Sequence, residues 1–168
     1  MIAATRTAAG LAGLLTLAAP ALAEWAPFAS PGDGFTVDFP AAPEVTARND
    51  DITLVSDTLY TVATPTTVAQ VQAVRFFQAP AGDPPGLDLF RGVLRAAACS
   101  ADGLATESIG AAVAHSRSGL CQGGAYGFAH RMVFAGDRAW LIVYAGPPGT
   151  EASPEAKRFL ASFRLTAR

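Results

Sequence analysis

The chain has few of the residues that most often carry out chemistry or hold metal ions. Its 168 residues include two cysteines, two histidines and a single lysine, and charged residues make up 15%. The formal net charge of −2 predicts no basic surface for nucleic acid or an anionic membrane. Zinc ligands usually come in close pairs such as C-x2-C, and Cys99, His115, Cys121 and His130 contain no such pair. The sequence therefore predicts neither a metal site nor a cofactor, and the two histidines are expected to be partly exposed strand residues.

A long hydrophobic run is also missing. The apolar stretch from Ala8 to Ala19 is shorter than the ~20 residues that span a bilayer. It follows Arg6 and ends before the small residues Ala21 and Ala23, which is the order of a secretory signal. We predict a signal peptide over residues 1–23 that is cleaved, no lasting membrane insertion, and localisation in the periplasm (or outside the cell) of a Gram-negative bacterium. Residues 24–168 have the length of one domain.

The two cysteines, Cys99 and Cys121, form an even pair, which in an oxidising compartment predicts a disulfide. A reduced buried pair or a metal-bound pair are the alternatives. Cys121 also lies in a G-x-C-x-G pattern that resembles a nucleophile elbow, and such an elbow needs a buried strand before it and a helix after it. Residues 116–118 and 124–126 offer neither. The sequence favours Cys121 as a disulfide partner and predicts no catalytic residue.

The segment Gly32-Asp33-Gly34 precedes an alternating run from Phe35 to Phe39 that ends at Pro40. Alternation with a period of two predicts a strand with one buried face. A phosphate-binding glycine loop requires the opposite order, with a strand before the glycines and a helix after them. The glycines are therefore predicted to form a turn.

Further β-rich runs predict an antiparallel sheet. A hairpin connection is expected at 64–67. In the run that follows it, 68–77, the apolar positions change phase, which indicates either burial on both sides or a β-bulge. The last predicted strand, 139–145, is apolar on both faces and is therefore expected to lie in the middle of the sheet. A loop is expected at 116–124. The predicted strands cover residues 52–63, 68–77, 108–115 (weakly), 126–134 and 139–145.

Two helices are predicted between and after these strands. The first runs from Leu87 to about Ala101, with Asp83 as its N-cap and Cys99 on the side away from its apolar stripe. The second begins after Ser153, a good capping residue that is followed by Pro154. Strands, helix, strands and helix in this order predict an α+β fold with a mainly antiparallel sheet.

Two stretches resemble small exported bacterial proteins of the PsbP-like fold. They are "GFTVDFPAAPEV" near the start and "DRAWLIVYAGPPGTEASPEAKRFLASFRL" at the end. The resemblance implies an antiparallel sheet sandwiched between helices and a binding or accessory role on the outer side of a membrane. The middle of the chain, which contains both cysteines, departs from that pattern, and no family site residue transfers to this chain.

The leading functional hypothesis is an exported, non-enzymatic accessory domain that acts through protein–protein contacts in the cell envelope. One alternative is a carrier of a small molecule or lipid in an apolar cleft. Another is a cysteine-dependent enzyme that uses Cys121 with His115 or His130. Loops on a rigid frame favour binding, so partner contacts are expected at 79–86, 116–124 and 146–153.

Overall fold

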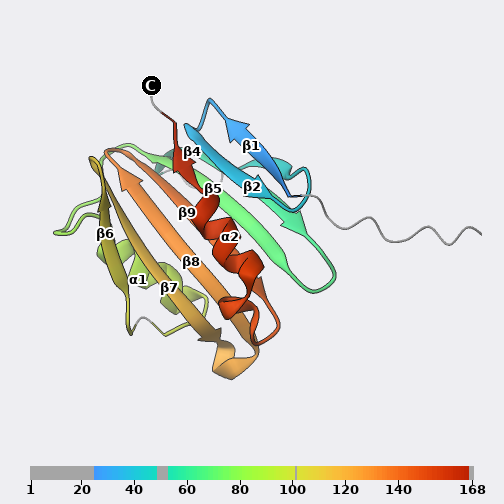
Figure 1. Ribbon diagram of the computed structural model, residues 1–168. Coiled ribbons are helices and arrows are strands. Elements are labelled where there is room, and N and C mark those ends of the chain that lie inside the picture. The colour runs from blue at the N-terminus through green and yellow to red at the C-terminus, as the bar shows by residue number, and fades with distance from the viewer. Residues whose placement is uncertain (1–24, 49–52, 101, 167–168) are drawn as a thin grey trace, which may run out of the picture.

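The computed structural model describes residues 25–48, 53–100 and 102–166. The predicted signal peptide therefore lies outside the described residues. The main feature is a seven-stranded antiparallel sheet in the order β3-β4-β5-β9-β8-β7-β6 (Figure 1). Its strands, in chain order, are β3 (Glu44–Arg48), β4 (Leu54–Ala63), β5 (Val68–Phe76), β6 (Ala105–Ile109), β7 (Ala112–Cys121), β8 (Tyr126–Ala135) and β9 (Arg138–Gly146).

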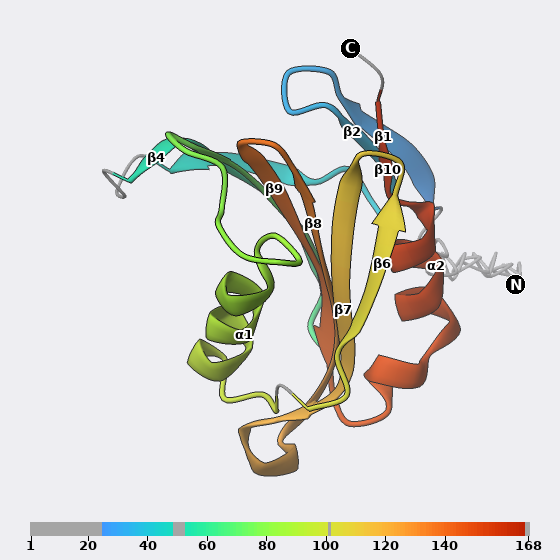
Figure 2. The same ribbon diagram turned by 90° about the vertical axis from the view of Figure 1, so that its left-hand side faces the viewer.

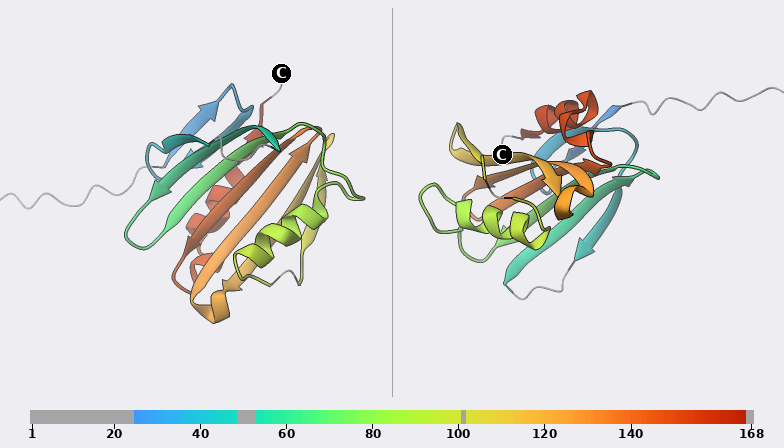
Figure 3. Two further views of the ribbon diagram at one scale, coloured as in Figure 1. Left: turned by 180° about the vertical axis from the view of Figure 1, so that it is seen from behind. Right: turned by 90° about the horizontal axis from the view of Figure 1, so that it is seen from below.

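A smaller sheet and two helices cover the two faces of the large sheet. The small sheet has the order β1-β2-β10, formed by Ala26–Ser30, Phe35–Phe39 and Arg164–Leu165. Helix α1 (Leu87–Ala96) lies on one face, across β7 and β8 (Figure 3). Helix α2 (Pro154–Ser162) and the small sheet lie on the other face (Figure 2). The predicted α+β class with mainly antiparallel strands is confirmed.

Strand β9 separates two hydrophobic cores. Trp140, Ile142 and Tyr144 face the core beneath α2 and the small sheet, whereas Leu141 faces the core beneath α1. Alternate side chains of a strand point to opposite faces, so the unbroken apolar run from Ala139 to Ala145 places this strand in the middle of the molecule. β9 pairs with β5 on one side and with β8 on the other, which confirms the predicted central strand.

The predicted turn at Gly32-Asp33-Gly34 is confirmed, and it joins β1 to β2. The Tyr60 hydroxyl donates to Asp33 Oδ2 at 2.5 Å, and Trp140 Nε1 donates to the backbone oxygen of Asp33 at 2.9 Å. Burial, and then the hydrogen bond to Asp33, raise the pKa of Tyr60 to about 12. The turn thus fastens the small sheet to strands β4 and β9 of the large sheet.

Helix α1 differs from its prediction at both ends. Its N-cap is Gly86, with φ of 74°, and not Asp83. A Cβ at Gly86 would lie 2.3 Å from the Phe134 ring, so close packing of the helix start on β8 requires glycine there. The helix stops at Ala96 because Ala98 adopts a left-handed conformation with φ of 54°. Cys99 therefore lies beyond the helix and is buried, which corrects its predicted place on the outer side of the helix.

The segment after α1 also differs from its prediction. In place of one weak strand at 108–115 and a loop at 116–124, the chain forms β6 and β7 with a turn at 110–111. Residues 116–121 belong to β7 and pair with β8, and only the short 3₁₀ turn η1 (Gln122–Gly124) follows. Backbone hydrogen bonds to β8 hold this polar, glycine-containing segment extended, although its residue types have low β-propensity.

Three further details concern strands of the two sheets. Strands β1 and β3 were not predicted, and every residue of β3 is exposed. The β4–β5 connection at 64–67 is confirmed. The phase change in β5 reflects burial on both sides, because Val71 lies in one core and Val74 packs on the other. The register shift itself lies in β4, between Leu54 and Ser56.

Helix α2 begins as predicted. The Ser153 hydroxyl accepts a hydrogen bond from the Ala156 N–H at 3.1 Å, and Pro154 opens the helix. We expect Ser153→Ala to lower the free energy of unfolding by about 1 kcal/mol, since it leaves that N–H without its cap, and to lower the melting temperature by about 3 °C. Thermal unfolding followed by circular dichroism measures the change. Ser118→Ala, at an exposed strand position, is the control, and an equal effect of both variants would contradict the capping role.

Candidate functional site

The disulfide predicted between Cys99 and Cys121 is confirmed. Both residues are buried, beside Phe90, Leu94 and Phe128 in the core beneath α1. Both cysteines of the chain are bonded, so Cys121 offers no thiolate for nucleophilic chemistry or for a metal ion in this state. The described residues also contain no group of three or more histidine, cysteine or carboxylate side chains that could hold a metal ion.

Both histidines are buried, which corrects the expectation that they are partly exposed. His115 is 0% exposed, and its ring nitrogens make hydrogen bonds of 2.9 Å with Thr106 Oγ1 and with the backbone oxygen of Pro85. It lies between the rings of Phe90 and Phe134. His115 therefore ties β6 and the loop before α1 to the sheet, and it has no free nitrogen for catalysis.

His130 occupies a different environment. It is 6% exposed, its ring centroid lies 4.6 Å from that of Phe128, and its Nδ1 atom is buried with no hydrogen-bond partner. Burial lowers the pKa of His130 to about 4, because the charged form loses its hydration there. His130 is therefore neutral at physiological pH. The expected partial exposure of His130 was wrong because strand alternation alone does not show which face of the sheet helix α1 covers.

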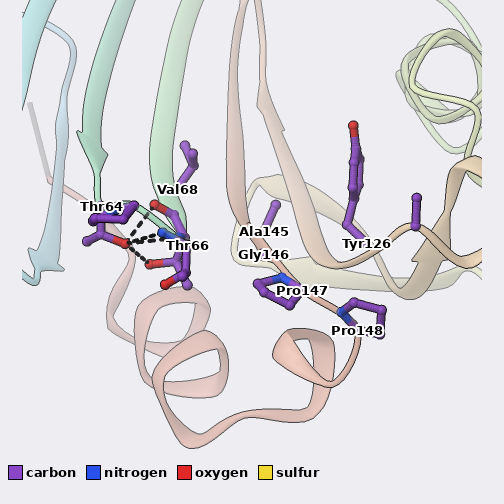
Figure 4. A pocket seen from close by; sticks show the side chains of 11 residues that line it. Thr64, Thr66, Val68, Tyr126, Ala145, Gly146, Pro147 and Pro148 are labelled. Carbon is purple, nitrogen blue, oxygen red and sulfur yellow. Dashed lines mark hydrogen bonds between the residues drawn. The ribbon is translucent and has the colours of Figure 1, made fainter.

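A groove opens at the end of the sheet where three connections meet, and we call it the end groove. It has a volume of about 590 Å³. Figure 4 shows the prolines of the segment after β9 on one side of it, Tyr126 at the start of β8, and the β4–β5 turn opposite. Its lining residues are Thr64, Pro65, Thr66, Thr67, Val68, Ala125, Tyr126, Ala145, Gly146, Pro147 and Pro148.

The walls of the end groove are held in place by local contacts. In the β4–β5 turn, Thr64 Oγ1 accepts from the Thr67 N–H at 2.9 Å and lies 2.8 Å from Thr67 Oγ1. A Cβ at Gly146 would lie 2.9 Å from the backbone oxygen of Thr66, so only glycine lets this turn approach the end of β9 so closely. The groove is thus a preformed surface, which reduces the ordering cost of binding.

The chemistry of the end groove is neutral and largely apolar. None of its lining residues carries a charge. Tyr126 is 39% exposed, and tyrosine combines a large apolar ring with a hydroxyl that can form hydrogen bonds. Such a surface can bind proline-containing or apolar segments, but it contains no acid–base pair.

The three loops expected to make partner contacts lie in different places. The segment 146–153 contributes Gly146, Pro147 and Pro148 to the end groove. The segment 116–124 is mostly strand, and its last residues adjoin the groove through Ala125. The segment 79–86 packs on the sheet through Pro85 and Gly86 and lies away from the groove. Sequence reasoning did not identify Tyr126 or the threonine turn as groove residues.

Comparison with known proteins assigns no family to this chain. No family model matches the chain, and no curated protein matches it. A crystal structure of a Bacteroides thetaiotaomicron protein is similar at 18% identity and a TM-score of 0.46, over 84% of this chain and 48% of that one. The chain thus spans about half the length of that protein. No helix among the described residues is long and apolar enough to cross a membrane.

Proposed function

We propose that this chain is an exported, non-enzymatic accessory domain that binds a protein partner in the cell envelope through the end groove. The disulfide supports an oxidising compartment such as the periplasm, because such bonds are rare in the cytosol of mesophiles. The arrangement of helices on both faces of an antiparallel sheet supports the PsbP-like resemblance, which we retain as a proposal.

The observation that carries this function is a half-exposed aromatic side chain beside two prolines in an uncharged groove. Tyrosine is enriched at the energetic centres of protein interfaces, and charged residues are depleted there. Pro147 and Pro148 add rigid apolar surface that loses little entropy on binding.

We expect Tyr126→Ala to weaken the partner complex by about 2 kcal/mol, roughly 30-fold in Kd, because it removes the central apolar contact. A photo-crosslinking residue at position 126 in the native host identifies the partner, and binding of the purified pair is then measured by calorimetry. Phe77→Ala is the matched control, since Phe77 is an exposed aromatic residue (68%) outside the groove. Equal affinities of the Tyr126 variant and the unsubstituted protein would refute the proposed site.

A second candidate function is the transport of a small apolar molecule or lipid. The groove volume falls within the range of about 300–1,000 Å³ found for small-molecule sites, and the lining has no charge. Native mass spectrometry of protein purified from its host distinguishes the two functions. A stoichiometric bound molecule that Ala145→Phe displaces would favour transport, and a ligand-free protein that binds its partner would favour the accessory role.

A further inference from the structure

Strand β10 has an unpaired outer edge at a place far from the end groove. Among the strands that the structure describes, it pairs with β2 alone and ends the small sheet. Thr166 N donates to Gly34 O at 3.0 Å, which makes these two residues a hydrogen-bonded pair of the ladder. In an antiparallel ladder such pairs alternate with pairs that form no hydrogen bonds. Leu165, opposite Phe35, belongs to the second kind, so its N–H and C=O point away from β2.

Two hollows adjoin at Leu165. The larger one, about 500 Å³, lies toward the turn between β6 and β7, and the smaller one, about 250 Å³, lies toward the turn between β8 and β9. Leu165 lines both hollows. The larger one is also lined by Ile109, Gly110, Arg131, Val133, Phe163 and Arg164, and the smaller one by Gly34, Ala135, Asp137, Arg138, Trp140 and Thr166.

The charges around these hollows are mainly positive. Arg131 and Arg164 line the larger hollow, and Arg138 lines the smaller one. Arg131 forms an ion pair with Glu107, and Arg164 donates to backbone oxygens, at 2.7 Å in the case of Phe163. Asp137, the one acidic lining residue, is paired with Arg75 at 2.7 Å. Three arginines thus line the hollows at the edge. The charge of Arg131 is balanced by Glu107 and that of Asp137 by Arg75, so the excess positive charge comes from Arg138 and Arg164.

An exposed strand edge flanked by side-chain hollows is the geometry that binds an extended peptide by strand addition. Backbone hydrogen bonds then provide affinity, and the hollows select alternate side chains. A strand places residues i and i+2 on the same face, so one added segment can fill both hollows while it pairs with Leu165. The arginines favour a segment with carboxylate side chains.

We propose that the β10 edge, with its two arginine-lined hollows, is a second interaction site that binds an extended acidic segment of another protein as an added strand. This site is separate from the end groove and shares no lining residue with it. A domain with both sites holds two different segments at once, which suits an accessory protein that bridges partners.

The test uses two synthetic peptides, TVEVEVT and TVKVKVT, with the full mature chain. We expect the acidic peptide to bind at least about tenfold more tightly than the basic one at low salt, because opposite charges attract across the site. Saturation with the acidic peptide should slow hydrogen exchange of the Leu165 amide by about tenfold or more, since that N–H acquires an acceptor. Calorimetry and amide-resolved NMR measure the two effects.

Arg164→Glu provides the variant and Arg95→Glu the matched control on exposed α1 surface. The first should weaken binding of TVEVEVT about tenfold, and the second should change it less than about twofold. Equal binding of both peptides, or a Leu165 amide that stays unprotected at saturation, would overturn the proposal. Protection of Leu165 that rises with protein concentration in the absence of peptide would also overturn it, because a second copy of the chain would then occupy the edge. Tyr126→Ala should leave peptide binding unchanged, which separates this test from that of the end groove.

Discussion

The free energy of unfolding is expected to fall by about 3 kcal/mol through His130 alone as the pH is lowered from 6.5 to 4. The folded protein keeps this ring neutral, since burial lowers its pKa to about 4, whereas the unfolded chain binds a proton below about 6.5. The unfolded state therefore gains protons that the folded state does not, and each pH unit in this window costs about 1.4 kcal/mol. Above about pH 7.5 the residue contributes almost no pH dependence.

Urea unfolding of the unsubstituted protein and of His130→Leu between pH 7.5 and 4 measures this effect. The difference between the two proteins isolates the histidine from the carboxylates, which titrate in both. Leucine replaces a ring whose Nδ1 has no partner, so the substitution leaves no buried group newly unsatisfied, and the variant should be the more stable protein at low pH. A parallel pH dependence of the two proteins, or an NMR titration midpoint of His130 near 6.5, would contradict the prediction.

Removal of the disulfide is expected to lower the free energy of unfolding by about 3 kcal/mol. The bond closes a loop with a sequence separation of 22, and a crosslink of this length restricts the unfolded chain by about that amount. It also joins the end of α1 to the end of β7, where Gln122 N donates to Ala98 O at 2.8 Å. Without the bond, α1 depends on this contact and on the packing of Phe90 and Leu94.

The double variant Cys99→Ala/Cys121→Ala, measured by urea unfolding, tests this expectation without burying new polar groups. Hydrogen exchange should accelerate in α1 more than in β9, which the crosslink does not touch. Reduction of the unsubstituted protein is the control and should lower the stability by a similar amount. If both treatments left the unfolding midpoint unchanged, the disulfide would have no role in stability.

Regular alternation predicted much of the fold. Phe35, Val37 and Phe39 placed β2, and the two apolar faces of β9 placed it at the centre, because side-chain pattern and burial are directly linked in strands. The end of α1 could not be predicted in this way. The run Ala96-Ala97-Ala98 has high helix propensity, and the turn at Ala98 brings Cys99 beside Cys121, a tertiary contact that local sequence does not show.

The candidate sites were harder to predict than the strands. The end groove combines three connections that are distant in sequence, and the segment 146–153 was the one expected contact loop that contributes residues directly to it. The burial of His130 depends on which face α1 covers. The outward N–H of Leu165 depends on the ladder register with β2. Each of these properties arises from pairing or packing between distant parts of the chain.

The pairing of β5 with β9 also governs the order in which the chain folds. Strands β3 to β5 form one series of neighbours along the chain, and β6 to β9 form another. The two series meet where Val68 pairs with Ala145, a contact across a long intervening segment, and contacts of this kind form slowly. During folding, one side of β5 therefore stays unpaired until β9 joins it, and the chain is most prone to misassociation during that interval.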